Sequence, residues 1–318
     1  MKVIANTIER HLAVHARGCK PEQKEVQTQG IYGSKRRDRM ARYEDSPVLI
    51  ETDRLAERLD DPSIRIVEVD EDTTAYDKGH IKNALAWNWF VDLRDPVKRD
   101  FIDQDGLSRL LQQAGVDENT TVVLYGGNNN WFAAYAYWLL RYLGFDSVKL
   151  LNGGRKKWEL EGRELVTEVP QFSPTNFRVT GPVRGELRAF RDEVLQKLGK
   201  VNLVDVRSPE EYRGERLAPD HLPQEQAQVP GHIPGAKNIP WSKAVEEDGT
   251  FRSPEELAKL YTEQGVTKDR GTIAYCRIGE RSAHTWFVLH ELLGYPNVEN
   301  YDGSWTEYGS LVGVPIER

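Results

Sequence analysis

From residue 47 onward, short apolar runs alternate with longer segments in which apolar residues recur at helical spacing. Short runs rich in Val, Ile, Leu and Tyr predict buried strands, whereas the longer periodic segments predict amphipathic helices. The elements expected in the first part of the chain are helix 52–59, strand 64–69, strand 121–125, helix 131–143 and strand 148–151. This alternation predicts an α/β fold with a central parallel sheet.

The same order of elements returns in the second part of the chain, after a break. Residues 164–184 contain Pro170, Pro174 and Pro182 and show no helical period, so we expect them to form a linker. The elements expected beyond it are helix 186–198, strand 202–206, helix 254–264, strand 272–275, helix 282–293 and strand 298–301. Two α/β units of similar order therefore follow one another.

Equivalent residues in the two parts recur at nearly constant spacing, which identifies an internal repeat. A Gly-His-Ile turn occurs at His80 and at His232, which differ by 232 − 80 = 152 positions. Three further pairs differ by 150 positions each: 276 − 126, 294 − 144 and 303 − 153. We therefore expect two domains, each with a central parallel sheet flanked by helices and with functional loops at the carboxyl ends of the strands.

Residues 1–46 lack sustained periodicity and are rich in Lys, Arg, Gln and Glu, so we expect a disordered extension. Two alternatives remain open for this segment. Translation could begin at Met40, or the segment could be an organelle transit peptide, although its glutamates are unusual for one.

Composition limits the classes of function. Hydrophobic residues make up 39% of the chain and charged residues 29%, which is typical of a globular protein, and no apolar run reaches the roughly 18 residues of a membrane span. The net charge of −7 and the scattered basic residues argue against a nucleic-acid partner. The two cysteines, Cys19 and Cys276, suggest no disulfide framework, so we expect a reducing, cytoplasmic setting. No Cys or His pair has metal-ligand spacing, and no cofactor is expected.

The polar loop 276–282 is the strongest candidate for chemistry. It lies between the predicted strand 272–275 and the predicted helix 282–293, where backbone N–H groups, a helix dipole and two arginines converge on Cys276. Such a setting predicts that Cys276 is a thiolate at neutral pH. The alternative is that Cys276 serves only as a small apolar side chain buried at the end of the strand. The first half has Gly126 at the equivalent position, followed by Gly127, Asn128 and Asn129, so the nucleophile occurs only once.

Four motifs carry a resemblance to a known family. They are the loop Cys-Arg-Ile-Gly-Glu-Arg-Ser, Asp-Val-Arg-Ser-Pro-Glu-Glu-Tyr at 205–212, Gly-His-Ile-Pro-Gly-Ala at 231–236 and Asn-Tyr-Asp-Gly-Ser-Trp at 300–305. Over residues 47–312 the chain resembles two-domain rhodaneses, and its loop resembles that of actinobacterial thiosulfate sulfurtransferases. The resemblance implies an inactive rhodanese domain at 47–163 and a catalytic one at 185–318, while the oligomeric state stays open.

The resemblance also implies a reaction in which Cys276 takes a sulfur atom from thiosulfate as a persulfide and passes it to cyanide or a thiol. Thiosulfate is a dianion, so the site needs a nucleophile of lowered pKa and fixed positive potential. Arg277 and Arg281 are expected to hold the donor's sulfonate, and the loop N–H groups to hold the persulfide. The expected substrate-binding residues are Arg207, Arg277, Ile278, Gly279, Glu280, Arg281 and Ser282.

One of these assignments has an alternative, and two other polar residues have expected roles of their own. Arg207 matches a family position that enters the pocket and binds the substrate anion, but it could instead form a salt bridge with Glu210 or Glu211. Asp205 is expected to orient the loop or Arg207 rather than to act as a base. His232 recurs as His80 in the half without a nucleophile, which favours a structural role in the turn.

The donor and the class of activity also have alternatives. Ile278 replaces the lysine of vertebrate-type thiosulfate enzymes, whereas mercaptopyruvate enzymes resemble Cys-Gly-Ser-Gly and lack the arginine, so Arg277 favours thiosulfate over 3-mercaptopyruvate. A non-enzymatic sulfur-relay module would keep the same cysteine. Phosphatases related to this fold place five residues between cysteine and arginine, whereas four separate Cys276 from Arg281, and Glu280 would repel a phosphate. We therefore expect no phosphatase activity.

Overall fold

The computed structural model describes residues 43–218 and 226–318. The predicted extension up to residue 42, including Cys19, lies outside the described residues. The prediction of disorder is wrong for its last four residues, because Tyr43 is buried and its hydroxyl donates to the carbonyl of Arg252 at 2.7 Å. In the same segment, Ser46 Oγ accepts from the N–H of Leu49 at 3.1 Å. The folded part therefore begins before residue 47.

The first half is built on a five-stranded sheet in the order β1-β5-β4-β2-β3, and every pairing is parallel. Its strands are β1 (Leu49–Ile50), β2 (Ile64–Asp70), β3 (Ala84–Asn88), β4 (Thr121–Tyr125) and β5 (Val148–Leu151). β2 is buried along its whole length, as expected of a strand covered on both faces. The parallel sheet confirms the predicted fold class for this half.

The second half has a four-stranded parallel sheet in the order β7-β6-β8-β9. Its strands are β6 (Asn202–Asp205), β7 (Lys237–Asn238), β8 (Thr272–Tyr275) and β9 (Val298–Tyr301). β8 is central, so the loop that follows it opens at the carboxyl edge of the sheet, where functional loops of such folds lie. This places Cys276 directly after a buried strand.

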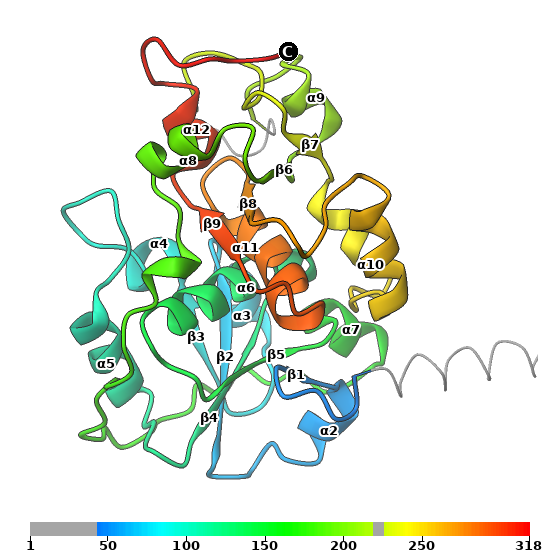
Figure 1. Cartoon of the computed structure of the whole chain (residues 1–318). Helices are drawn as coiled ribbons and strands as arrows, with labels where there is room; N and C mark the ends of the chain where they lie inside the picture. The colour runs from blue at the N-terminus through cyan, green and yellow to red at the C-terminus, as the bar shows by residue number, and fades with distance from the viewer. Residues whose placement is uncertain (1–42, 219–225) are drawn as a thin grey trace, which may run out of the picture. The chain divides into compact units, whose positions relative to one another are not determined.

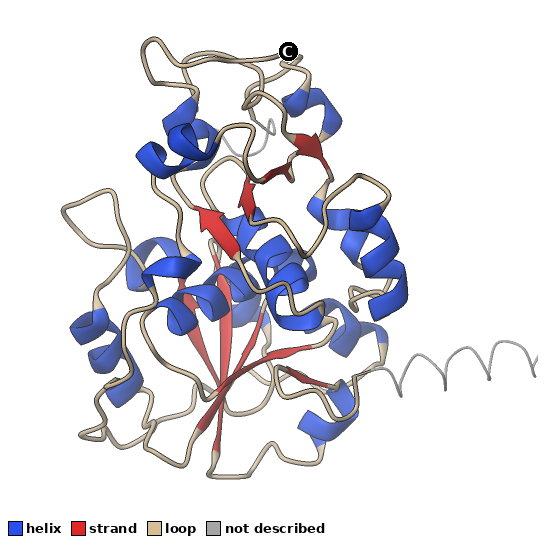
Figure 2. Cartoon of the chain, in the orientation of Figure 1, coloured by secondary structure: helices blue, strands red, loops and turns tan. Residues whose placement is uncertain are grey.

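Helices flank both sheets (Figures 1 and 2). The first half contains α2 (Thr52–Ala56), α3 (Thr74–Lys78), α4 (Trp89–Asp92), α5 (Gln104–Gln113), α6 (Gly127–Tyr142) and α7 (Gly154–Leu160). The second half contains the 3₁₀ turns η1 (Gly185–Leu187) and η2 (Trp241–Ala244), the helices α8 (Arg191–Lys197), α9 (Pro209–Tyr212), α10 (Pro254–Thr262), α11 (Glu280–Trp286) and α12 (Ser304–Tyr308), and the π-helical turn η3 (Phe287–Leu292). The capping box of α10 forms between Ser253 and Glu256.

Most of the predicted strands match the structure, but one predicted helix does not. The segment expected to form helix 186–198 is interrupted, because Arg188 forms a parallel bridge with Asn300 and the N–H of Ala189 donates to the carbonyl of Asn300 at 3.0 Å. Backbone groups used in this pairing are not available to a continuous helix. The helix therefore begins only at Arg191, as α8.

The two helices that follow the equivalent loops, α6 and α11, pack against each other. Their contact continues into η3, where the rings of Tyr137 and Phe287 lie perpendicular with centroids 4.8 Å apart. Trp131 of α6 meets Trp241 edge-on at 5.6 Å. One hydrophobic core thus contains residues of both halves, and the first half supports the helix that carries the cysteine loop.

The apolar run from Trp131 to Leu140 is a buried part of α6, within the helix predicted at 131–143. Residues Asn128, Asn129 and Asn130 have left-handed backbone angles, so regular helical geometry starts at Trp131. Across the described residues, we find no helix with the length and apolar character needed to span a bilayer.

The two turn histidines make matching contacts in the two halves. The His80 ring stacks on Tyr76 with centroids 3.7 Å apart, and His232 stacks on Tyr212 at 3.6 Å. Each Nδ1 lies within hydrogen-bond distance of the carbonyl of the same tyrosine, at 2.9 Å and 2.8 Å. The same arrangement in a half without a cysteine agrees with the predicted structural role of His232.

Candidate active site

Cys276 is completely buried at the end of β8, and the backbone of its own loop turns back to its sulfur. The N–H of Gly279 donates to Sγ at 3.1 Å, and the N–H of Cys276 donates to Ser304 Oγ at 3.0 Å. Gly279 has φ 99°, and a Cβ there would lie 2.6 Å from the Cα of Asp302. Only glycine fits this position, so the loop conformation depends on it.

Two polar side chains fix the carbonyl of Gly279. Ser282 Oγ lies 3.0 Å from this oxygen and 2.6 Å from Asn300 Oδ1, and Asn300 Nδ2 donates to the same carbonyl at 3.1 Å. All three groups are buried, which strengthens these hydrogen bonds. Ser282 therefore shapes the loop through its hydroxyl group, from the first turn of α11.

The predicted lowered pKa of Cys276 is wrong. Burial raises the pKa of the thiol, and the carboxylate of Glu280, whose Oε2 lies 3.5 Å from Sγ, raises it further, against the opposing effect of Arg281. Burial also raises the pKa of the Glu280 carboxyl, against Arg281 and Arg277. The positive groups around the loop can be recognised from the sequence. The complete burial of the Cys276 thiol cannot.

Arg281 forms a buried, bidentate ion pair with Glu211. Its two terminal nitrogens donate to the two carboxylate oxygens at 3.0 Å each, and the ring of Trp131 lies 5.7 Å from the guanidinium carbon. Burial alone would raise the pKa of Glu211, but Arg281, together with the N–H of Ser208 and the charge of Arg207, outweighs burial and lowers this pKa. Glu211 also accepts from the N–H of Ser208 at 3.0 Å, which ties the start of α9 to the cysteine loop.

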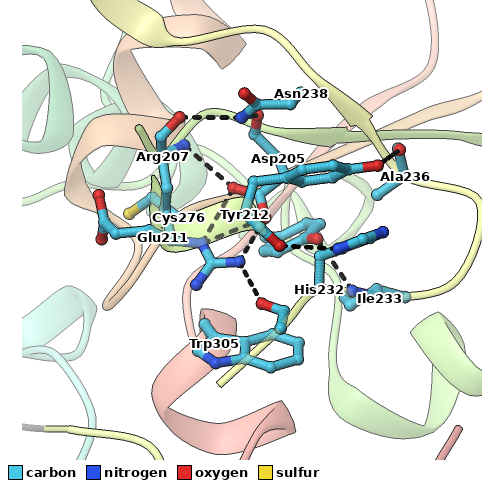
Figure 3. Close-up of polar contacts among 12 residues, drawn as sticks. Asp205, Arg207, Glu211, Tyr212, His232, Ile233, Ala236, Asn238, Cys276 and Trp305 are labelled. Atoms are coloured by element: carbon cyan, nitrogen blue, oxygen red, sulfur yellow. Dashed lines mark hydrogen bonds and ion pairs between the residues drawn. The ribbon is translucent and has the colours of Figure 1, made fainter. Parts of the chain in front are cut away.

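Arg207 is fully buried and forms a salt bridge with Asp205. The alternative considered from the sequence, a salt bridge with Glu210 or Glu211, is therefore wrong. The Nε of Arg207 lies 3.0 Å and 3.1 Å from the two Asp205 oxygens, and a terminal nitrogen donates to the carbonyl of Gly231 at 2.7 Å (Figure 3). The backbone N–H of Arg207 also donates to Asp205 at 3.0 Å. Asp205 thus orients Arg207, as the sequence predicted.

Arg277 and Ile278 follow Cys276 in the loop, and both are buried. Arg277 is 2% exposed, and its carbonyl accepts from the N–H of Thr306 at 3.0 Å. Ile278 lines a cleft whose walls contain residues of both halves. The cleft is lined by Trp89, Arg94, Arg99, Asp100, Phe101, Tyr135, Ile278 and Asp302.

The first-half residues of this cleft could not be recognised from the sequence, because they follow no motif and lie far from Cys276 along the chain. Beside the cleft, Arg188 bridges two of its acidic residues, with hydrogen bonds of 2.9 Å to Asp100 and to Asp302. With Arg94 and Arg99 on its wall, the cleft combines aromatic surfaces with basic groups next to the cysteine loop.

Groups that could bind a metal are not gathered anywhere in the described part of the chain, where no cluster of three His, Cys, Asp or Glu residues occurs. His284, in α11 and eight residues after Cys276, packs against Trp241 and Phe251 with ring centroids 5.1 Å and 4.9 Å away. Burial lowers the pKa of His284 to about 3, so its imidazole is neutral. The contacts of His284 are therefore those of a side chain packed in the core.

Comparison with known proteins adds independent information. The family profile described as "Rhodanese-like domain" matches residues 51–161 and 190–311. A Mycolicibacterium smegmatis protein provisionally named thiosulfate sulfurtransferase is 61% identical over 272 residues, which cover 86% of this chain and 98% of that protein. The Thermus thermophilus sulfur carrier protein TtuD is 55% identical over 282 residues, or 87% of this chain and 98% of that protein.

Among solved structures, the chain is similar to SseA from Escherichia coli, described as a 3-mercaptopyruvate sulfotransferase with the rhodanese fold. The TM-score is 0.68 at 25% sequence identity, and the match covers 81% of this chain and 98% of that one.

Proposed function

This chain belongs to the rhodanese-like family, and we propose that it is a sulfurtransferase that carries a sulfur atom on Cys276 as a persulfide. The observation that carries the proposal is the position of the Cys276 sulfur, buried after β8 and 3.1 Å from the N–H of Gly279. A backbone N–H in this position stabilises negative charge on sulfur. The equivalent loop of the first half has no thiol, so one site per chain is expected.

In the first half-reaction, the thiolate of Cys276 attacks the outer sulfur of the donor. With thiosulfate, a new S–S bond forms, the bond to the sulfonate sulfur breaks, and sulfite leaves with the electron pair. Arg281 and Arg277 supply positive charge next to the reacting sulfur, as their effects on the pKa of Glu280 indicate. The positive charge of the two arginines therefore stabilises the negatively charged persulfide as well as the anionic donor.

In the second half-reaction, a nucleophile removes the outer sulfur and restores the cysteine. Cyanide or a thiol meets this requirement, and ping-pong kinetics follow because the sulfur rests on the enzyme between the two steps. The basic groups Arg94 and Arg99 in the cleft beside Ile278 suit the approach of an anionic donor.

Thiosulfate is the donor that we propose, because Arg277 is present and because the M. smegmatis relative is provisionally named for it. A second candidate is 3-mercaptopyruvate, since the E. coli structural neighbour is described as acting on it. The relative rates of sulfur transfer from the two donors, measured at equal concentrations, distinguish them. A rate with 3-mercaptopyruvate well above that with thiosulfate would reassign the donor.

The persulfide itself is tested by mass spectrometry of the intact protein. After incubation with thiosulfate and removal of excess donor, Cys276 should gain the mass of one sulfur atom, and cyanide should then remove it as thiocyanate. Cys276→Ser is the matched negative control, since the substitution replaces only the sulfur atom of the side chain by oxygen. Sulfur transfer retained in Cys276→Ser would disprove the proposal.

A sulfur-relay protein is the alternative from a different class, and the name of the T. thermophilus relative favours it. Such a protein would acquire the persulfide but release it slowly to cyanide and rapidly to a protein thiol. Comparing the rates at which cyanide, a small thiol and a protein thiol discharge the labelled Cys276 separates a relay from a small-molecule enzyme.

A further inference from the structure

Building on the proposed function, we propose that Glu280 is the proton acceptor of this site. Its carboxylate takes the thiol proton of Cys276 when the persulfide forms and returns it when the cysteine is restored. This assigns to Glu280 a catalytic role beyond the binding of substrate.

The geometry places the carboxylate against the sulfur. Glu280 Oε2 lies 3.5 Å from Sγ, and both residues have no exposed surface. The other oxygen, Oε1, is buried and makes no hydrogen bond to the described residues. Leaving a carboxylate oxygen buried without a partner costs stability, so this arrangement is not explained by structural needs. Such a group in contact with a nucleophile is typical of an acid or base in a functional site.

The site needs a proton acceptor because the thiol is not ionised by its surroundings. Burial and the neighbouring carboxylate raise the pKa of Cys276, and its sulfur has no contact with bulk water. The other possible proton acceptors near this loop are already bound to a partner or are unsuitable. Both carboxylate oxygens of Glu211 accept hydrogen bonds from Arg281. His284 is neutral and packs between aromatic rings.

Several charged groups determine which of the two side chains carries the proton. Arg281 and Arg277 favour a negative charge on the pair, and the N–H of Gly279 favours that charge on the sulfur. Tyr135 of α6 and Asp302 after β9 also face the loop, and both stay uncharged more readily because burial raises their pKa. Two negative charges 3.5 Å apart are unfavourable, so the pair holds one proton that can move between them.

The first half offers an internal comparison, because Asn130 occupies the position equivalent to Glu280 (280 − 130 = 150). Asn130 is also buried, and its side chain turns back in the same way: Oδ1 accepts from the N–H of Gly126, the residue equivalent to Cys276, at 3.0 Å. Its Nδ2 donates to the carbonyl of Leu151 at 2.6 Å. A neutral amide therefore suffices to hold this turn, and a carboxyl group occurs only where there is a thiol.

The proton and electrons balance with the proposed reaction. Transfer of the proton to Glu280 leaves the Cys276 thiolate, which attacks the outer sulfur of thiosulfate and expels sulfite with the electron pair. The proton stays on Glu280 beside the negatively charged persulfide. Cyanide then attacks the outer sulfur, thiocyanate leaves, and the thiolate can take its proton back.

The test is persulfide formation by Glu280→Gln in single-turnover experiments, as a function of pH. Cys19→Ser as background leaves Cys276 the one thiol in the chain. If Glu280 accepts the proton, the variant should form the persulfide about 100-fold more slowly near neutral pH and should recover as the pH rises. If Glu280 only repels the thiolate, its removal lowers the pKa of the thiol, and an equal or faster rate near neutral pH would overturn the proposal.

Alkylation of Cys276 by iodoacetamide gives a readout that needs no sulfur donor, so it separates this proposal from the proposed function. The alkylation rate of Glu280→Gln should fall near neutral pH even if thiosulfate proves to be the wrong donor, and an unchanged or higher rate would contradict the proposal. Glu280→Asp keeps a carboxyl group and should retain part of both rates, with its pH profile close to that of the wild type. Glu263→Gln, which removes an exposed carboxylate paired with Lys259, is the control and should change neither rate.

Discussion

Arg155 and Arg207 occupy the same buried place in the two halves, although they come from different elements. Arg207 follows β6 and pairs with Asp205, which lies opposite Tyr275 in the sheet. Arg155 belongs to α7 and pairs at 2.7 Å with Glu68, which lies opposite Tyr125. Each arginine also donates at 2.7 Å to the carbonyl of the glycine before a turn histidine, Gly231 and Gly79 respectively. The half without a thiol keeps this ion pair, so the pair belongs to the scaffold.

We predict that Arg207→Met and Arg155→Met destabilise the protein to a similar extent, by about 3–5 kcal/mol, because each leaves a buried carboxylate without its partner. Urea unfolding of both variants measures this. Arg213→Met, which removes an exposed arginine, should change the free energy of unfolding by less than about 0.5 kcal/mol. A large rise in the KM for thiosulfate in Arg207→Met, without loss of stability, would restore the donor-binding role predicted from the sequence.

Asp70 gives the first half a pH-dependent stability. Burial raises its pKa to about 7, against the N–H of Gly127, while Glu68 and Asp72 raise it and Arg155 lowers it. The folded state therefore binds this proton more tightly than the unfolded state, whose pKa is about 4. Its contribution to stability is complete below about pH 4, decreases as the pH rises, and is lost above about pH 7, with a total change of roughly 4 kcal/mol.

Thermal unfolding of Asp70→Asn measures this contribution. The variant should lose much of the decrease in Tm that the wild type shows between about pH 5 and about pH 8, because asparagine does not ionise. Its Oδ1 can still accept from the N–H of Gly127, so the fold should be kept. A wild-type Tm that rises over this interval would contradict the assigned direction of the pKa.

Arg281→Lys tests whether this arginine acts mainly through Glu211. Lysine keeps the charge but cannot make both hydrogen bonds to the carboxylate, so we expect kcat to fall about tenfold with little change in the donor KM. Steady-state kinetics with thiosulfate measure both constants. Arg191→Lys, an exposed arginine paired with Asp192, is the control. A rise in KM with an unchanged kcat would instead show that Arg281 binds the donor directly.

Arg99→Gln tests whether the donor enters through the cleft beside Ile278. Loss of this positive charge should raise the donor KM about three- to tenfold at low ionic strength, with little effect on kcat, because Arg99 lines the cleft and Cys276 does not. The effect should shrink as salt is added. Lys98→Gln removes the neighbouring charge, which does not line the cleft, and equal effects of the two substitutions would argue against a specific entrance.

We predict no hydrolysis of aryl phosphates above background. Four residues separate Cys276 from Arg281, and Glu280 is one of them. Its carboxylate is turned to the sulfur, where it would repel a phosphate dianion. Release of the phenolate is easily followed by absorbance. Turnover that disappears in Cys276→Ser would reassign the class of enzyme.

Much of the fold follows from local patterns. Strands β4, β5, β8 and β9 were predicted with their observed bounds, because buried parallel strands are continuous apolar runs that depend little on distant residues. The break in the helix predicted at 186–198 could not be foreseen, since it results from pairing between Arg188 and Asn300, which are far apart in the chain. The sequence likewise gave no sign of the cleft, whose walls are shared between the halves.

The position of the candidate site follows from local sequence: a single thiol after a buried strand, in a loop whose repeat partner lacks it. The pKa of that thiol depends on how the folded chain buries it. The positive groups near Cys276 can be read from their spacing, but burial comes from the packing of α11 against α6 of the other half. Because the cost of a buried charge depends on the distance to water in three dimensions, the raised pKa of Cys276 and the partners of Arg207 and Arg281 became visible only in the folded chain.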